Sequence, residues 1–487
     1  MKQILITCLL TLLVLISCTR NVENPEQVYS IPSIYPDYID VTIPVDIAPM
    51  NFEIEDEAVE CIDVAVKGSK GGEMHVQGAY ADFDVDKWHE LTEQNEGGEL
   101  TFTVCVQKEG KWLQYEDFKM YVSKYHLDDY GLTYRRIAPG YEVGGYIGMY
   151  QRDLHSFDEE TMLKESAVPG QCMNCHTANR CSATEYLLHV RGDKGGTMVM
   201  RDGKQVWLNT KTDSTRMNCG YSYWHHSGKY IASSINKINQ LFFTGKDRRI
   251  EVFDSESDVV VIDATTNELI LNERLMTNDF ETYPVFSADG KTMYYCTAKY
   301  CQIPAEYDKQ RYSLCSIPFD EKSGTFGAEI DTLLNASTDS LSFTYPRPSY
   351  DGRWLMYCVS DFGNFPINHK ESDLWLMDLK TKKTRPVTEV NSDDSESFHN
   401  WSTDSHWFVF SSRRGDGMYN KAYIACIDDS GKMSKPFLLP QRNPRKYYDE
   451  CFESFNCPDF TKDKIDFDVK MVSKACLNNE RVQVKIR

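Results

Sequence analysis

Hydrophobic and polar residues alternate over short runs along most of the chain, and tight polar turns separate these runs. Four segments share one pattern, in which a strand end, a turn of Asp-Gly or Ser-Gly type and a hydrophobic strand follow one another. They are residues 223–232, 284–293, 347–356 and 400–409. An outer strand follows each of them, most clearly at residues 373–379. This repeat predicts the blades of a β-propeller over residues 186–467, with five blades visible in the sequence and six expected.

One position of the repeat holds a small residue in all four segments. Seven residues after the turn lie Ser234, Cys296, Cys358 and Ser411. Because a propeller is crowded near its centre, the pattern predicts one recurring inward position there. The two cysteines are then packing residues rather than metal ligands or disulfide partners.

Residues 31–136 also alternate over short runs, with strands expected at residues 40–45, 61–66 and 100–106. Glycine-rich turns separate these strands, and the length and spacing predict a small β-sandwich of immunoglobulin type. Cys61 and Cys105 fall inside expected strands, where they form either an inter-sheet disulfide or two buried thiols. The whole protein is therefore expected to be all-β.

The turns of the later repeats resemble the WD40-like (PD40) repeat of the TolB family, in which W/F-S-x-D-G-K precedes I-A-F/Y-S. Asp289-Gly290-Lys291 matches this signature best, and Asp351-Gly352-Arg353 matches it nearly as well. The other two turns depart from it, because Ser227 replaces the aspartate in one and Ser405 replaces the glycine in the other. The resemblance implies a TolB-like propeller for this part of the chain.

The amino terminus predicts export. An almost unbroken apolar run covers residues 4–16, and it is too short for a permanent transmembrane helix. The run ends in Leu15-Ile16-Ser17-Cys18, which resembles a bacterial lipobox. Residues 1–17 are then a signal peptide and Cys18 is lipidated, the alternative being an ordinary secretory signal with a chance cysteine. Thr19 favours the outer membrane, and residues 18–30 are expected to tether the protein to it, on the periplasmic or the surface side.

Charge and motifs narrow the possible partners and activities. The net charge is -20 and the basic residues are dispersed, so nucleic acid is excluded as an expected partner. The sequence has no G-x-S-x-G elbow, P-loop, Rossmann fingerprint or H-E-x-x-H motif, and it predicts no catalytic residues. We expect an unidentified redox or other protein partner in the cell envelope, and membrane contact through the lipid alone.

One stretch carries recognisable chemistry. Cys172-Met173-Asn174-Cys175-His176 is a complete C-x-x-C-H, the attachment signature of c-type heme. In such a motif Cys172 and Cys175 bond covalently to one porphyrin, and His176 is the proximal iron ligand. The alternatives are a redox C-x-x-C pair with an incidental histidine and half of a zinc site, although no second ligand pair is present for zinc. We expect the motif on a connector, residues 137–185, with residues 468–487 forming a polar tail.

The second axial ligand of such a heme is not specified by the sequence. His225 is the first candidate, because the other repeats have serine at its position. His399, at a blade entrance, and His189, close to the motif, are weaker candidates. The alternative to each is an ordinary surface or core histidine, and an open sixth position would favour ligand or catalytic chemistry.

The segment Tyr134–Tyr141, the C-x-x-C-H motif and the repeats together resemble exported TolB-like propeller lipoproteins with one heme motif, some of which are loosely named after cytochrome c biogenesis. Three hypotheses follow. The first is a lipid-anchored protein with one heme c that transfers or senses electrons, using the propeller as a docking scaffold. The second is a non-redox propeller that binds another envelope protein or a glycan. The third is a heme enzyme with an open iron site.

Overall fold

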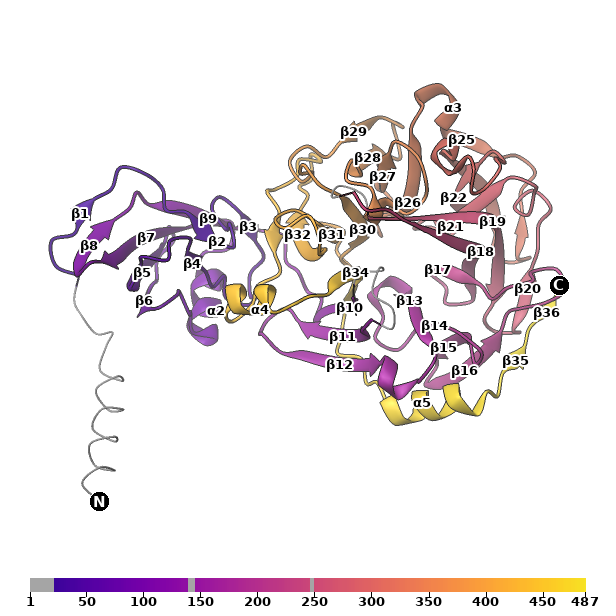
Figure 1. Ribbon diagram of the computed structural model, residues 1–487, viewed down its shortest axis with the longest axis horizontal. Helices are drawn as coiled ribbons and strands as arrows, with labels where there is room; N and C mark the ends of the chain where they lie inside the picture. Colours follow the sequence, from indigo (N-terminus) through magenta and orange to yellow (C-terminus); the bar gives the residue numbers. More distant parts are fainter. Residues whose placement is uncertain (1–21, 139–144, 246–248) are drawn as a thin grey trace, which may run out of the picture. The chain divides into compact units, whose positions relative to one another are not determined.

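The computed structural model describes residues 22–138, 145–245 and 249–487 (Figure 1). The expected signal peptide and the lipidation site Cys18 lie outside the described residues. The chain divides into two compact units. The first contains the described residues up to His126 with His155–Phe157 and Lys435–Cys451, and the second contains the remainder. Within the described part of the chain, no helix combines the length and the apolar character needed to cross a bilayer.

The first unit is built on one seven-stranded sheet. Its order is β1 (Glu26–Gln27), β8 (Lys111–Gln114), β7 (Glu99–Lys108), β5 (Cys61–Gly68) and β6 (Glu73–Gly78), with β9 (Phe118–Val122) beside β7 and β3 (Thr42–Ile43) beside β9. Two short strands, β2 (Ile34–Tyr35) and β4 (Glu53–Ile54), pair separately, and the carboxyl-terminal segment of this unit adds α4 (Pro444–Asp449).

The expected immunoglobulin-like sandwich is not confirmed. A helix, α2 (Val85–Gln94), begins where the Asp84 side chain accepts a hydrogen bond from the Lys87 amide, and it buries Trp88 and Leu91. Cys61 and Cys105 lie in adjacent strands of the same sheet, opposite Gln107 and Asp63 respectively, so a disulfide between two facing sheets does not form.

The second unit is a six-bladed β-propeller, as the repeats predict. Blade 1 contains β34 (Ser454–Thr461), β10 (Gly131–Ile137), β11 (Ile147–Asp153) and β12 (Glu159–Lys164), and blade 2 contains β13 (Cys172–Ala178), β14 (Tyr186–Arg191), β15 (Gly196–Arg201) and β16 (Lys204–Asn209). Blade 3 contains β17 (Gly220–Trp224), β18 (Tyr230–Phe242), β19 (Ile250–Asp263) and β20 (Glu268–Ile270). Blade 4 contains β21 (Phe280–Phe286), β22 (Thr292–Ala298), β23 (Tyr312–Asp320), β24 (Thr325–Phe326) and β25 (Asp331–Leu334). Blade 5 contains β26 (Ser342–Pro348), β27 (Trp354–Ser360), β28 (Asp373–Asp378) and β29 (Thr384–Pro386). Blade 6 contains β30 (Glu396–Trp401), β31 (Trp407–Ser412), β32 (Lys421–Cys426) and β33 (Phe437–Leu438).

The propeller begins earlier in the chain than the repeats suggest. β34, near the carboxyl terminus, pairs antiparallel with β10, from Gly131 opposite Thr461 to Ile137 opposite Ser454. This pairing closes the ring and adds β10, β11 and β12 to it. The propeller unit therefore starts at Leu127, and the expected connector over residues 137–185 consists largely of blade strands.

The carboxyl-terminal residues 468–487 are ordered elements rather than a plain polar tail. Asp468 caps α5 (Val469–Asn478), whose Val472 and Cys476 are buried. After the helix, β35 (Val482–Gln483) and β36 (Lys485–Ile486) pair in parallel with the outer strands of blades 2 and 3. These four strand residues are exposed and the strands are only two residues long, so the sequence pattern does not reveal their pairing.

The first strand of every blade contains a β-bulge. The register shifts once along β13, β17, β21, β26, β30 and, relative to β10, along β34. In five of the blades the shift coincides with a residue in the left-handed region; these are Tyr221, Tyr283, Tyr345, Phe398 and Cys457. Beside the bulges lie the small residues that the repeat predicts: Ser234, Cys296, Cys358 and Ser411 pair with the residue just before the shift and are fully buried. The prediction of a crowded inward position is confirmed.

Candidate functional site

The C-x-x-C-H sequence lies on a strand of the propeller rather than on a loop. Cys172–Ala178 is β13, the first strand of blade 2, and it pairs with β14. The register shift falls between Met173 and Cys175, which is where the other blades have their bulge. The first strands of neighbouring blades contact one another around the ring, so the motif lies beside the axis of the propeller.

His176, like His89 and His399, has a ring nitrogen that is buried without a hydrogen-bond partner among the described residues. In His176 this atom is Nε2. Burial and, to a smaller extent, the nearby Arg135 guanidinium lower the pKa of this imidazole to about 4, against the opposing effect of a hydrogen bond with the backbone of Thr133. The ring is therefore neutral at physiological pH, which is the form that binds metal ions.

A cavity of about 340 Å³ opens at the end of the propeller where the first strands begin. Cys172, the first residue of β13, lines it, together with Tyr221 near the start of β17 and Phe398 near the start of β30. Four arginines also line it, and the described lining residues include no aspartate or glutamate. They are Arg135, Arg191, Arg249 and Arg413.

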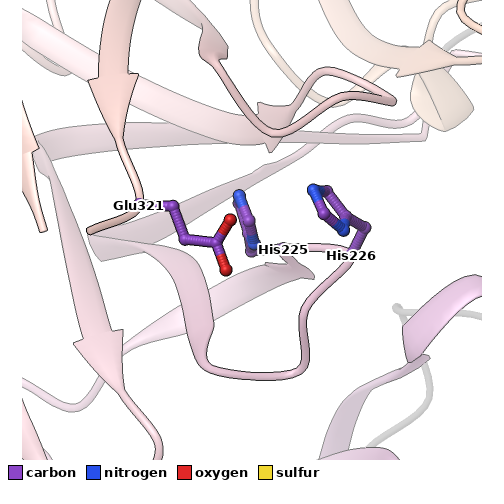
Figure 2. Close-up of side chains that lie close together, drawn as sticks. All are labelled: His225, His226 and Glu321. Atoms are coloured by element: carbon purple, nitrogen blue, oxygen red, sulfur yellow. The ribbon is translucent and has the colours of Figure 1, made fainter.

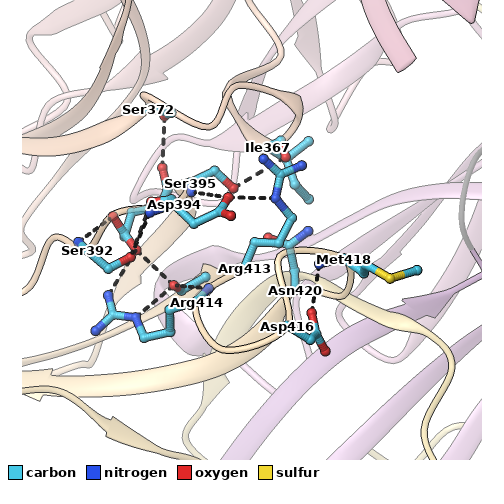
Figure 3. A network of polar contacts seen from close by, with 12 residues as sticks. Ile367, Ser372, Ser392, Asp394, Ser395, Arg413, Arg414, Asp416, Met418 and Asn420 are labelled. Atoms are coloured by element: carbon cyan, nitrogen blue, oxygen red, sulfur yellow. Dashed lines mark hydrogen bonds and ion pairs between the residues drawn. The ribbon is translucent and has the colours of Figure 1, made fainter. Parts of the chain in front are cut away.

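One wall of the cavity is held by a network of polar contacts (Figure 3). Arg413 directs its Nε toward Asp394 and donates to Oδ1 at 2.7 Å, and the neighbouring Arg414 donates from Nη2 to Glu396 Oε1 at 2.9 Å. The Glu396 side chain is fully buried and also accepts hydrogen bonds from the hydroxyls of Ser392 and Ser412. The network ties the segment that carries Arg413 and Met418, both lining residues, to residues 392–396.

A second wall comes from a long hairpin. β18 and β19 contain 13 and 14 residues, about twice the length of most strands in the other blades, and this hairpin carries Ile238, Ile250 and Val252 to the cavity. His369 bridges this hairpin to the loop after β27: its Nε2 lies 3.2 Å from Glu251 Oε1 and its Nδ1 lies 2.9 Å from Glu371 Oε1. Burial lowers the pKa of His369, but the two carboxylates outweigh burial and raise it to about 9.

His225 does not line the cavity beside Cys172, and its ring is hydrogen-bonded to other residues. It lies in the turn after β17, with Nδ1 2.8 Å from Ser227 Oγ and Nε2 donating to the Gly290 carbonyl at 3.2 Å. Figure 2 shows it beside His226 and Glu321, and one ligand atom from each of the three lies within 4.8 Å of the others. Both ring nitrogens of His225 are hydrogen-bonded, so a metal ion or a heme iron would have to displace one of these partners.

The two weaker candidates are core histidines in the structure. His399 is fully buried with Nδ1 3.8 Å from Cys358 Sγ, and His189 is buried with Nδ1 3.0 Å from Thr197 Oγ1. Burial lowers the pKa of each to about 3. Neither lines the cavity that Cys172 lines. The structure therefore does not gather these histidines around one site, whereas the four arginines, which no sequence motif marks, do meet.

No protein-family model and no curated protein matches this chain. Solved structures do match it at low identity. TolB from Acinetobacter baumannii is 12% identical over 78% of this chain and 86% of its own, with a TM-score of 0.43. An oligogalacturonate lyase in complex with manganese is 13% identical over 60% and 73%, with a TM-score of 0.35. The dihydro-heme d1 dehydrogenase NirN in complex with DHE is 9% identical over 86% and 76%, with a TM-score of 0.33. These likenesses concern the fold alone, and at such TM-scores they say nothing about ligand or activity.

Proposed function

We propose that the propeller carries one covalent heme c, bonded through Cys172 and Cys175 with His176 as an iron ligand, and that the protein transfers or senses electrons in the cell envelope. The observation that supports this best is the His176 ring, which is neutral and has a buried Nε2 without a partner. A metal-binding histidine commonly has its second nitrogen held by a backbone group, and the Thr133 backbone is available to His176 for this purpose.

The residues around Cys172 suit the group chemically. A porphyrin is apolar and planar and carries two propionates; the cavity beside Cys172 offers aromatic and aliphatic walls and four arginines. When bound, the heme supplies a one-electron redox couple. The protein's own residues would bind it, orient it and exclude water from it, and the remainder of the propeller would serve as the docking scaffold for a partner.

The extended backbone does not hold the three ligands in place beforehand. Four residues of β-strand span roughly 13 Å, whereas four residues of helix span roughly 6 Å. Cys172 and His176 lie at opposite ends of such a stretch of β13. One porphyrin bonded to both cysteines and to the histidine requires a shorter separation, so attachment of heme is expected to convert residues 172–176 from strand to a tighter turn.

Two alternatives each have an observation in their favour. The position of the motif at a bulge that every blade shares favours a non-redox propeller, in which Cys172–His176 is one more first strand and the ligand is another envelope protein or a glycan. The third hypothesis, a heme enzyme with an open iron site, is favoured by the placement of His189, His225 and His399, none of which lines the cavity.

The proposed location follows the sequence expectation. The protein would be anchored in the outer membrane by lipid on Cys18, facing either the periplasm or the surface. Its redox or protein partner would be a component of the same envelope. A Cys18→Ala variant tests the anchor, since it should appear in the soluble fraction of the envelope.

Protein produced in a host with c-heme maturation is expected to carry one covalent heme, seen by a pyridine hemochrome spectrum and heme staining of a denaturing gel. Cys172→Ser and Cys175→Ser together should abolish the stain, because no thioether can form. Cys457→Ser is the matched control, since Cys457 lines the same cavity outside the motif and its loss should leave the stain unchanged.

The outcomes separate the three hypotheses. A wild-type protein without covalent heme would exclude both heme hypotheses and leave the non-redox propeller. Covalent heme whose reduced form binds carbon monoxide would favour the open-site enzyme over an electron carrier with two protein ligands. His176→Leu should alter the spectrum of the heme-loaded protein, whereas in the heme-free protein it should be neutral or stabilising, because it removes an unsatisfied buried nitrogen.

A further inference from the structure

The cavity at the start of the first strands has a charge opposite to that of the whole protein. The chain has a net charge of -20, with 73 acidic and 53 basic residues. Yet its described lining has four arginines and no acidic residue. A random sample of this surface would contain more carboxylates than guanidinium groups, so the composition of the lining is a specific feature of the cavity.

The arginines reach the cavity from four different blades. Arg135 comes from β10, Arg191 from the end of β14, Arg249 from the residue before β19 and Arg413 from the residue after β31. Arg413 pairs with Asp394 behind the wall, and Arg135 directs Nη1 toward the Met173 carbonyl at 3.5 Å. Asp394 thus lies behind the wall, whereas the four arginines themselves line the cavity.

The rest of the lining is suited to the planar or apolar part of a ligand. Tyr221, Phe365 and Phe398 contribute aromatic rings, and the Arg191 guanidinium lies 6.0 Å from the centre of the Tyr221 ring. Aliphatic side chains from β18 and β19 complete the wall. Ligand sites of this size commonly combine apolar walls with a few convergent polar groups, and arginines are the groups that bind carboxylates in a bidentate manner.

We infer that this cavity binds the carboxylate groups of a ligand with a planar or apolar body. The carboxylates have two possible sources: the propionates of a heme attached at Cys172, or a free organic polycarboxylate. The inference rests on the lining of the cavity alone and holds whether or not heme is attached. Neither source requires a chemical step, because the cavity binds the ligand through ion pairs and ring contacts.

The test uses full-length heme-free protein, produced without c-heme maturation, and benzenetricarboxylate (trimesate) as the probe in isothermal titration calorimetry. We expect saturable binding that weakens as ionic strength rises. Arg249→Gln should weaken it by about tenfold or more, because one charge-assisted contact is lost. Arg353→Gln, an exposed arginine on a turn of blade 5, is the matched control and should change nothing. The uncharged triol benzenetrimethanol should not bind.

A second arm uses the heme-loaded protein. Loss of trimesate binding on heme attachment would identify the propionates as the occupants, and unchanged binding would identify a free polycarboxylate. The inference fails if heme-free protein does not bind trimesate, or if Arg249→Gln and Arg353→Gln have equal effects. If the protein binds trimesate but never acquires heme, the proposed heme function is contradicted and the carboxylate site is supported.

Discussion

Replacing His369 with glutamine is expected to lower the free energy of unfolding at pH 6.5 and to have a much smaller effect at pH 9.5. In the folded protein the carboxylates of Glu251 and Glu371 raise the pKa of this buried imidazole to about 9, against 6.5 for the exposed ring. A raised histidine pKa contributes stability that is fully present below the unfolded value and disappears as pH rises through the folded value. The raised pKa of His369 corresponds to roughly 3 kcal/mol of unfolding free energy at the pH where the contribution is greatest.

The measurement is urea-induced unfolding of the wild type and His369→Gln at several pH values between 6 and 9.5. The difference between the two free energies of unfolding should be greatest at or below pH 6.5 and should shrink toward pH 9.5. His126→Gln is the control, because its ring pairs with Glu96 at 3.2 Å where both side chains are about half exposed. A difference for His369→Gln that stayed constant with pH would show that the ring is not charged in the folded protein.

The propeller could be predicted from the sequence because its signal is local. Blades 3 to 6 repeat a turn and the strands beside it, and the small residues at one position of the repeat mark the bulge next to the axis. Ring closure could not be predicted in the same way. It depends on β34 pairing with β10 across more than 300 residues, and neither strand contains the turn that identifies the other blades. For the same reason the repeats do not mark the start of the propeller unit at Leu127.

His225 shows how a break in a repeat can mislead. In blade 4 the Ser287 hydroxyl bonds to Asp289 Oδ1 at 2.7 Å, and that oxygen accepts the Lys291 amide. In blade 3 His225 Nδ1 bonds to Ser227 Oγ at 2.8 Å, and Ser227 accepts the Lys229 amide. A His–Ser pair therefore replaces the Ser–Asp pair of the turn. The departure from the pattern has a structural explanation that requires no ligand.

The arginine-lined cavity could not be predicted from the sequence. Arg135, Arg191, Arg249 and Arg413 are separated by some 50 to 160 residues and share no motif, and only the ring of blades brings them together. The C-x-x-C-H motif contributed the one lining residue that could be recognised, Cys172. What the sequence did not indicate is that this residue begins a strand, so that the motif and the arginines meet at one end of the propeller.

Glu396→Ala is expected to cost about 3–5 kcal/mol of unfolding free energy and to weaken binding in the cavity as well. The Glu396 carboxylate is fully buried, and it accepts hydrogen bonds from Ser392, Ser412 and Arg414. Alanine leaves the Arg414 guanidinium without its carboxylate and the buried Ser412 hydroxyl without its acceptor. Glu389→Ala is the matched control, because the Glu389–Arg385 pair is about one-third exposed and its loss should cost less than about 1 kcal/mol.

The effect on binding follows from the position of the network. Arg414 adjoins Arg413, and the residues that hold the two, Asp394 and Glu396, belong to the same short segment. If the network positions the cavity wall, Glu396→Ala should weaken trimesate binding under conditions where circular dichroism shows the protein still folded, and Glu389→Ala should not. Glu396→Gln separates charge from shape, since it keeps the volume and one acceptor while removing the ion pair with Arg414. Retained affinity in Glu396→Gln with reduced affinity in Glu396→Ala would mean that packing, rather than the buried charge, holds Arg413 at the cavity.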